Sequence, residues 1–179
     1  MFIELEKTYL AKYLPNDLDH HKSEEIIDIY IPETAEHPIL RIRKKGDNLE
    51  ITKKHPVNEN DASKQHEHTI KLDKQEFEAL IKDIKGKKVR KYRYYYDYKG
   101  KMLEIDIFQD VLFGLILVDI EFTDENEQNQ YFMPDFCLAE VTQEKPLAGG
   151  LIVGKTYEQI KPVLAKYNYK PIFYPKMDQ

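Results

Sequence analysis

The chain has 179 residues, of which 41% are hydrophobic and 33% are charged, and its formal net charge is −5. This length suits one domain with a buried core, and the acidic balance argues against a domain that coats nucleic acid through its overall field. A single cysteine, Cys137, excludes a disulfide within the chain and is typical of a cytoplasmic protein. No apolar run predicts a membrane span, and the charged residues near the start do not resemble a signal peptide.

Strands dominate the chain when it is followed in order. Alternating polar and apolar residues predict strands at 2–10, 25–31, 39–45, 48–54, 64–72, 89–98, 101–109 and 112–122, with a short strand near 139–142. Glycine-containing turns at 46–48 and 99–100 join two of these pairs, and the polar stretch 57–64 is expected to be a loop. Eight or nine strands with few helices indicate an antiparallel sheet, closed or nearly closed.

Three helices are expected between and after the strands. Asp73 caps the first, which runs to Asp83 and places Phe77, Leu80, Ile81 and Ile84 on one face. The second begins after a cap at position 123 or 124 and ends near 132. The third spans 156–167, with a proline at 162 as its expected kink.

Most predicted strands have one charged face and one apolar face. Side chains at i and i+2 share a face, so acids such as Glu4 and Glu6, or bases such as Arg41 and Arg43, form ordered pairs. A solvated outer face would explain any one strand. Taken together, the pairs favour a different interpretation, because paired bases bind phosphate oxygens and paired carboxylates chelate a hard cation. If the charged faces point inward, the helices at 73–84 and 156–167 are expected to cover the apolar outer faces.

A series of short motifs in this strand context resembles a known family. The motifs are Glu4-Leu5-Glu6, Arg41-Ile42-Arg43, Thr52-Lys53-Lys54, Lys91-Tyr92-Arg93, Glu104-Ile105-Asp106, Asp119-Ile120-Glu121-Phe122 and Glu140-Val141-Thr142. In this order, over about residues 2–160, the chain is similar to the CYTH domain, also called a triphosphate tunnel metalloenzyme. The resemblance implies a mainly β fold: one domain over 1–179 built on an eight-stranded antiparallel β-barrel tunnel with peripheral helices, the C-terminal helix and tail occupying 156–179.

The resemblance also implies hydrolysis or cyclisation of a triphosphate compound with Mg²⁺ or Mn²⁺. The expected partner is a small-molecule triphosphate or polyphosphate, without nucleic acid or membrane, and the protein is expected to be a monomer or homodimer. The expected roles are phosphate binding by Arg41, Arg43, Lys54, Lys91 and Arg93, metal binding by Glu4, Glu6, Asp119 and Glu121, and catalysis by Glu67, Glu104, Asp106 and Lys145.

Two departures from the family pattern keep other functions open. Thr8 stands where the family has its hallmark lysine, and Thr69 stands where it has an acid. A metal-dependent triphosphatase remains the main hypothesis. A binding module without turnover and an adenylyl cyclase are the alternatives.

Two further signals are given structural interpretations. The stretch 149–156 formally matches a phosphate-binding loop, but no suitable strand precedes it. His66 and His68 lie on the apolar side of their strand, where a structural role is expected.

Overall fold

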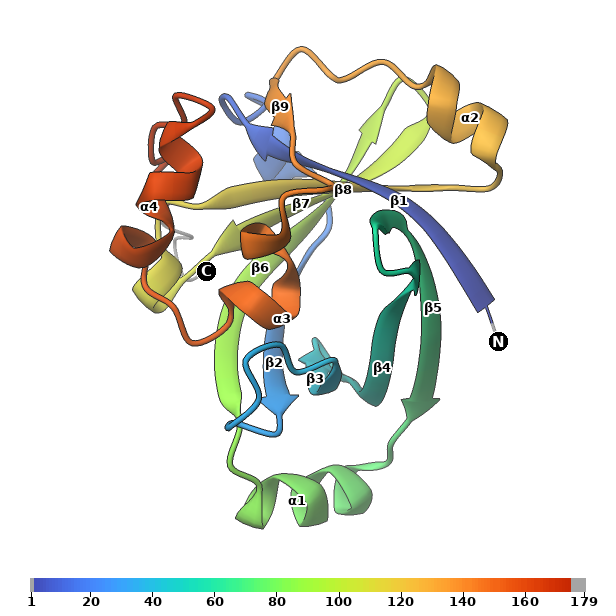
Figure 1. The fold of residues 1–179 in the computed structure, drawn as a ribbon, viewed down its shortest axis with the longest axis vertical. Helices are drawn as coiled ribbons and strands as arrows, with labels where there is room; N and C mark the ends of the chain where they lie inside the picture. Colours follow the sequence, from blue (N-terminus) through green and yellow to red (C-terminus); the bar gives the residue numbers. More distant parts are fainter. Residues whose placement is uncertain (1, 175–179) are drawn as a thin grey trace.

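A computed structural model describes residues 2–174, and its main feature is an antiparallel sheet that closes into a barrel (Figure 1). Eight strands follow one another around the barrel in the order β5-β4-β3-β2-β6-β7-β8-β1, and β1 pairs again with β5. The predicted eight-stranded antiparallel barrel is therefore confirmed. The strands are β1 (Phe2–Ala11), β2 (Ser23–Ile31), β3 (Leu40–Lys45), β4 (Asn48–Asn58), β5 (Asp61–Lys71), β6 (Lys87–Tyr98), β7 (Lys101–Phe108), β8 (Ile116–Phe122) and the additional β9 (Cys137–Glu140).

Short helices join and flank the strands. The α-helices are α1 (Lys74–Asp83), α2 (Glu125–Gln130), α3 (Gly149–Ile152) and α4 (Tyr157–Ala165). The 3₁₀ turns are η1 (Leu18–His20), η2 (Asp110–Leu112) and η3 (Lys145–Leu147). No helix within residues 2–174 is long and apolar enough to cross a membrane.

Strand β1 closes the barrel because its two edges have different partners. One edge pairs with β8 along residues 5–10. The other edge pairs with β5 along residues 2–5 and with β9 along residues 9–11. The strand that carries Glu4 and Glu6 therefore lies between β8 and β5, which brings the two ends of the sheet together.

The strand register places the charged faces inside. Residues directly opposite in an antiparallel pair share a face, so Arg43 opposite Asp28 and Arg93 opposite Asp106 each form a same-face pair. All four side chains are buried. The apolar residues of the same strands face outward, as the alternating pattern predicts.

The outer apolar core is covered by connecting segments, and the prediction that helices cover it is wrong. Strand residues such as Tyr9, Ile105 and Val118 pack with Phe136 and Leu18, which lie in the connections after β8 and β1. The segment after α4 also contributes, through partly buried apolar side chains at 172 and 174. The two predicted helices, α1 and α4, are not part of this outer cluster.

A second apolar cluster fills one part of the barrel interior. Leu10 and Leu117 lie opposite each other and continue the inward-facing rows of β1 and β8. They pack with Leu147 of η3 and with Ile160 and Leu164 of α4. Helix α4 therefore packs on η3 and on this end of the barrel interior, and not on the outer wall.

Helix α1 has the predicted capping box but not the predicted burial. The Asp73 carboxylate accepts a hydrogen bond from the Glu76 amide, and the Glu76 side chain accepts one from the Asp73 amide, both at 2.8 Å. None of the residues of α1 is fully buried. Figure 1 shows α1 at one end of the barrel, where it joins β5 to β6, and its contacts with the sheet include β4.

Some predicted boundaries are wrong. The expected strand 112–122 starts only at Ile116, because Gly114 adopts a φ of +105° and turns the chain after η2. The expected loop at 57–64 is mostly strand, since β4 and β5 continue to a tight turn at 59–60. Helix α2 begins after an Asp124 cap and ends at Gln130. Pro162 lies inside α4, and residues 175–179 of the expected tail lie outside the described part of the chain.

The glycines of the formal phosphate-loop pattern have packing explanations. A Cβ atom at Gly149 would lie 2.6 Å from the Tyr30 hydroxyl oxygen, and one at Gly150 would collide with the Pro38 carbonyl. The segment follows η3 and contains the short helix α3, and no strand immediately precedes it. A phosphate-binding loop is therefore not formed here.

Candidate functional site

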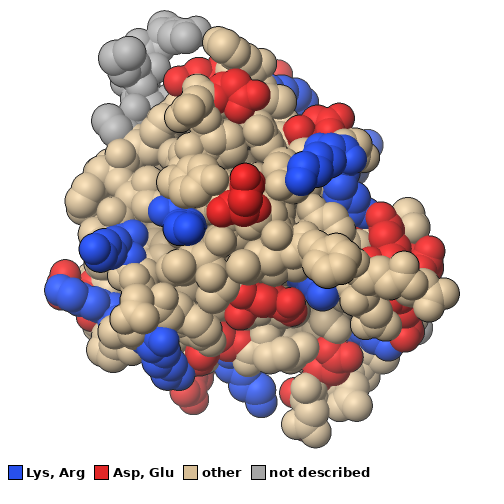
Figure 2. All heavy atoms as spheres, turned by 90° about the horizontal axis from the view of Figure 1, so that it is seen from above, with Lys and Arg blue, Asp and Glu red and all other residues tan. Residues whose placement is uncertain are grey.

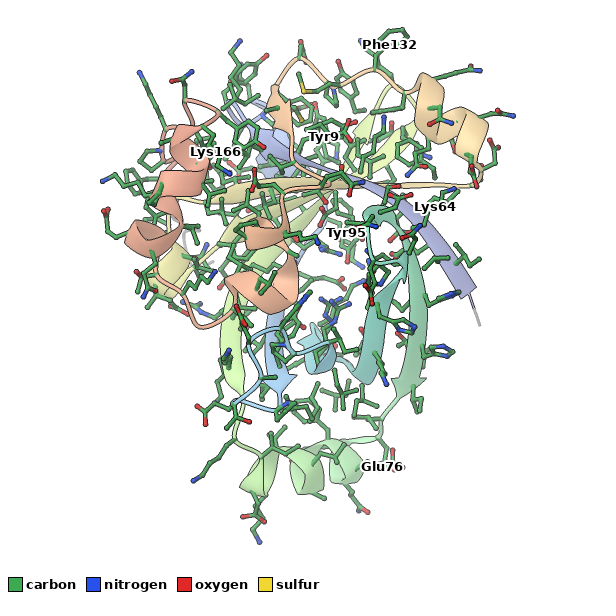
Figure 3. The ribbon with its side chains drawn as sticks, viewed as in Figure 1. Tyr9, Lys64, Glu76, Tyr95, Phe132 and Lys166 are labelled. Carbon is green, nitrogen blue, oxygen red and sulfur yellow. The ribbon has the colours of Figure 1, made fainter. Side chains whose placement is uncertain are left out.

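Every strand of the barrel contributes charge to the enclosed space, and Figure 3 shows side chains pointing into it, Tyr95 among them. The charge is concentrated here, whereas the face drawn in Figure 2 carries acidic and basic side chains interspersed. In the central part of this lining, eight carboxylates face five basic side chains, and the same faces continue with Glu24, Glu50, Lys45 and Lys71. The carboxylates belong to Glu4, Glu6, Asp28, Glu67, Glu104, Asp106, Asp119 and Glu121, and the bases are Arg41, Arg43, Lys54, Lys91 and Arg93.

A buried bidentate ion pair fixes Arg43. Its Nε and Nη2 atoms donate to the two Asp28 carboxylate oxygens at 2.7 and 2.8 Å. Burial raises the pKa of Asp28, but the Arg43 charge and hydrogen bonds outweigh it and hold this pKa well below its usual range. The remaining Nη1 atom lies 3.9 Å from Glu50. Asp28 therefore orients the guanidinium and leaves one nitrogen available to the interior.

A second buried cluster is centred on Asp106. Arg93 donates to its two oxygens from Nε at 2.7 Å and from Nη2 at 2.6 Å, and Lys91 also bonds this carboxylate. The third guanidinium nitrogen of Arg93 bonds Glu104. Burial opposes ionisation, but the charges of Arg93 and Lys91 lower the pKa of Asp106 to about 2. Burial, with repulsion from Arg93 and Arg43, lowers the pKa of Lys91 in spite of its bond to Asp106. In this arrangement Asp106 holds two bases in position.

The two inward-facing carboxylates of β1, Glu4 and Glu6, lie on either side of a lysine from β4. Lys54 Nζ lies 2.6 Å from Glu4 Oε2 and 2.7 Å from Glu6 Oε2. Only the Glu6 contact has hydrogen-bond geometry, so Glu4 Oε2 is a buried oxygen without a hydrogen-bond donor among the described residues. Burial raises the pKa of Glu4, but the Lys54 charge and a hydrogen bond with Glu121 lower it overall. The pKa of Glu6 is raised, because burial and repulsion from Glu4 and Asp119 exceed the attraction of Lys54.

The two acids of β8 complete this acidic side of the lining. Asp119 accepts a hydrogen bond from the Thr8 hydroxyl at 2.7 Å and lies 3.6 Å from Arg93 Nη2. Burial and the nearby Asp106 charge raise its pKa. Glu121 is more exposed than Asp119, but partial burial and its hydrogen bond with Glu4 still raise its pKa to about 8. Without a cation, these carboxylates are crowded enough to retain a proton.

Arg41 differs from the other arginines because no carboxylate fixes it. Its Nη1 atom donates to the Tyr30 hydroxyl at 3.4 Å, and its Nη2 atom lies 3.8 Å from Glu67. Its Nε atom is buried and has no hydrogen-bond partner in the described part of the chain. The Glu67 carboxylate accepts a hydrogen bond from Thr69 at 2.9 Å. Arg41 therefore has the most donor capacity left for an anion.

The structure brings twelve of the thirteen predicted site residues into the lining and leaves Lys145 outside it. Lys145 is exposed at the start of η3 and does not lie on a barrel strand. Lys7, which follows Glu6 on β1, faces outward, and its Nζ atom lies 3.7 Å from Glu140 Oε2. The sequence reasoning missed Asp28, because a lone acid in a strand of isoleucines gives no paired-charge signal.

The lining has ligands suited to a hard divalent cation, which takes oxygen ligands from carboxylates. Glu4, Glu6 and Glu121 supply such oxygens, and the buried Glu4 oxygen lacks a donor. Within residues 2–174, however, no three His, Cys, Asp or Glu side chains converge closely enough to hold a metal ion. These carboxylates are suitable ligands for a divalent cation, but their present positions are too far apart to coordinate one together.

Comparisons with known proteins agree with this geometry. A family model described as the CYTH domain matches residues 6–132. An inorganic triphosphatase of Nitrosomonas europaea is 29% identical over 143 residues, which cover 79% of this chain and 91% of that protein. A crystal structure of an inorganic triphosphatase superposes with a TM-score of 0.61 at 25% identity, covering 86% of this chain and 95% of that one. A putative adenylate cyclase from Bacillus halodurans shares the fold, with a TM-score of 0.51 at 16% identity over 100% of this chain and 97% of that one. The matched residues include nearly the whole barrel, and the chain belongs to the CYTH domain family.

Proposed function

We propose that this protein hydrolyses a triphosphate compound inside its barrel with the help of a divalent metal ion, and that inorganic triphosphate is the first substrate to test. The observation that carries the proposal is the inward arrangement of five basic side chains from three strands, facing a cluster of carboxylates on β1 and β8. The similarity to proteins named inorganic triphosphatases supports the same choice of substrate.

The bases have different tasks in this proposal. Arg41 has free donor capacity and binds the polyphosphate directly, through charge-assisted hydrogen bonds. Arg43 and Arg93 are already oriented by Asp28 and Asp106, so little side-chain entropy is lost when they meet a phosphate. Such positioning and electrostatic stabilisation account for most of the catalysis of phosphoryl transfer.

The excess of carboxylates over bases accounts for the expected metal dependence. A polyanion would be repelled by a lining in which acids outnumber bases, unless a cation offsets them. Glu4, Glu6, Asp119 and Glu121 would hold that cation, and we expect Mg²⁺ or Mn²⁺ because the ligands are oxygen atoms. A bound divalent ion would polarise the terminal phosphoryl group and lower the pKa of a water molecule.

A binding module without turnover is the second candidate, and one contact favours it. Thr8 bonds Asp119 through its hydroxyl, in the place where the family pattern has a lysine amine. A hydroxyl supplies no positive charge to the transferred phosphoryl group. Such a protein would bind triphosphate and metal with the same side chains but release no phosphate.

Phosphate release from inorganic triphosphate with Mg²⁺ or Mn²⁺ is the test. Release that depends on metal and is lost in Arg41→Ala supports hydrolysis. Calorimetric binding of triphosphate without release under either metal would favour the binding module instead. With ATP as substrate, cyclic AMP measured against free phosphate separates a cyclase from a phosphohydrolase.

A further inference from the structure

Lys54 occupies the space between the carboxylates that are expected to bind the metal ion. Its ammonium nitrogen lies within 2.7 Å of one oxygen from each hallmark glutamate, Glu4 and Glu6. Lys54 belongs to β4, and β5 lies between β4 and β1 in the barrel. Lys54 points into the barrel, on the same face as Glu67, which lies directly opposite it on β5. The side chain is only 21% exposed, and the two carboxylates hold its ammonium group from two sides. Lys54 is therefore a fixed positive charge at the centre of the acidic cluster.

A divalent cation at these carboxylates needs the same oxygen atoms. Carboxylate ligands lie about 2.0–2.6 Å from Mg²⁺ or Ca²⁺, so no cation can sit between Glu4 and Glu6 while the ammonium remains there. This explains why suitable acids are present although no three of them converge within residues 2–174.

We propose that Lys54 is a competing cation at the metal site, displaced when the metal binds and thereby released to bind a phosphate group of the substrate. Lys54 lies on the same inward face as Arg41, which pairs with Thr52 two residues before it. The released ammonium therefore joins the phosphate-binding side of the lining. Each ligand then favours the other, because the metal frees Lys54 for triphosphate and triphosphate keeps Lys54 away from the metal site.

The inference rests on the proposed binding of metal and triphosphate at this site, but its test needs no turnover. Mn²⁺ is titrated by calorimetry into wild type, Lys54→Met and Lys54→Arg. Methionine removes the competing charge at similar size, so the Mn²⁺ dissociation constant is expected to fall at least about tenfold. Arginine keeps the charge and is expected to leave Mn²⁺ affinity near that of wild type. Lys53→Met is the matched control, because Lys53 precedes Lys54 on β4 but is exposed on the outer face.

A second titration measures the coupling. Imidotriphosphate, whose P–N–P bridges resist hydrolysis, is expected to tighten Mn²⁺ binding in wild type and to tighten it less in Lys54→Met. Direct contact between metal and phosphate remains in both proteins, so only part of the effect depends on Lys54. An equal effect in the two proteins would contradict the release of Lys54 to the phosphate.

A measurement on wild type avoids any folding defect of the variants. Trace acetylation followed by mass spectrometry reports how reactive each lysine amine is. Mn²⁺ is expected to increase acetylation of Lys54 and leave that of Lys53 unchanged. Unchanged Mn²⁺ affinity in Lys54→Met, absence of Mn²⁺ binding in both proteins, or Lys54 acetylation that does not rise would each overturn the inference. If no phosphate is released but these binding results are obtained, the proposal of hydrolysis is refuted and the proposed role of Lys54 is retained.

Discussion

Replacing Asp28 with Asn tests whether the buried ion pairs of the lining are held as the structure indicates. Asp28 is 2% exposed and binds Arg43 through two hydrogen bonds of 2.7 and 2.8 Å. Asparagine keeps the size and one acceptor but leaves the buried guanidinium without a counter-charge. Breaking a buried ion pair in this way lowers the free energy of unfolding by roughly 3–5 kcal/mol. Because asparagine retains one acceptor, we expect a loss of about 3 kcal/mol. For a domain of this size that corresponds to a melting temperature lower by roughly 6–12 °C.

The exposed pair of Arg90 and Asp110 provides a control with similar geometry. Its two hydrogen bonds measure 3.0 and 2.6 Å, but Asp110 is 54% exposed. Asp110→Asn is therefore expected to cost at most about 1 kcal/mol, and asparagine tolerates the positive φ at this position. Thermal unfolding of the two variants under the same conditions gives the comparison. Equal losses in both would show that burial does not set the energy of these pairs, and the argument for an ordered interior would fail.

Three further predictions concern individual charges. Arg41→Ala should weaken triphosphate binding by roughly 2–3 kcal/mol, because Arg41 has a free donor for an anion. Mn²⁺ affinity should change much less, because an arginine is not a metal ligand. Calorimetry with each ligand checks both expectations. Glu121→Gln should raise the melting temperature of the metal-free protein at pH 8 and have no effect below pH 4.5. The reason is that the pKa of Glu121 is about 8 in the folded protein and 4.5 ordinarily, so the ionised side chain destabilises the folded state as the pH rises above 4.5. A pH-independent difference would contradict this. Lys7→Ala should leave phosphate release unchanged, because Lys7 points away from the lining; loss of activity would mean that the faces of β1 are assigned wrongly.

The barrel and its charged interior could be predicted because period-two alternation is a local property of each strand. The pairs Glu4 with Glu6 and Arg41 with Arg43 already fix which face is charged. Closure then follows from pairing, since β1 contacts both β8 and β5. The register is irregular only near Leu10–Ala11 and Pro56–Asn58 among the described strand pairings, outside the predicted charge pairs, so each of those pairs remains on one face.

The ion-pair partners could not be predicted, because they depend on contacts between strands far apart in sequence. Lys54 contacts Glu4 and Glu6 across 48 or more positions, and nothing in either motif indicates this. The role of Asp28 could not be predicted, because its neighbours in the strand are apolar and form no charged pair with it. Helix α1 was expected to cover the wall, but the position of a helix relative to a closed barrel is set by the strand ends it connects.

Because charged side chains occupy much of the barrel interior, a large part of the apolar core lies on the outer side of the strands. The connecting segments that cover this side therefore contribute to stability, although their structure is irregular. Phe136 lies in the connection between α2 and β9, is 3% exposed, and packs edge-on against Tyr96 and Tyr98 at centroid distances of 5.7 and 5.5 Å. Phe136→Ala should therefore cost roughly 3–5 kcal/mol, as in a conventional core. Phe132→Ala, in the same segment but 89% exposed, should stay within about 0.5 kcal/mol. Urea unfolding of both variants decides the matter, and a small loss for Phe136→Ala would mean that the charged interior contributes more of the stability than buried ion pairs ordinarily do.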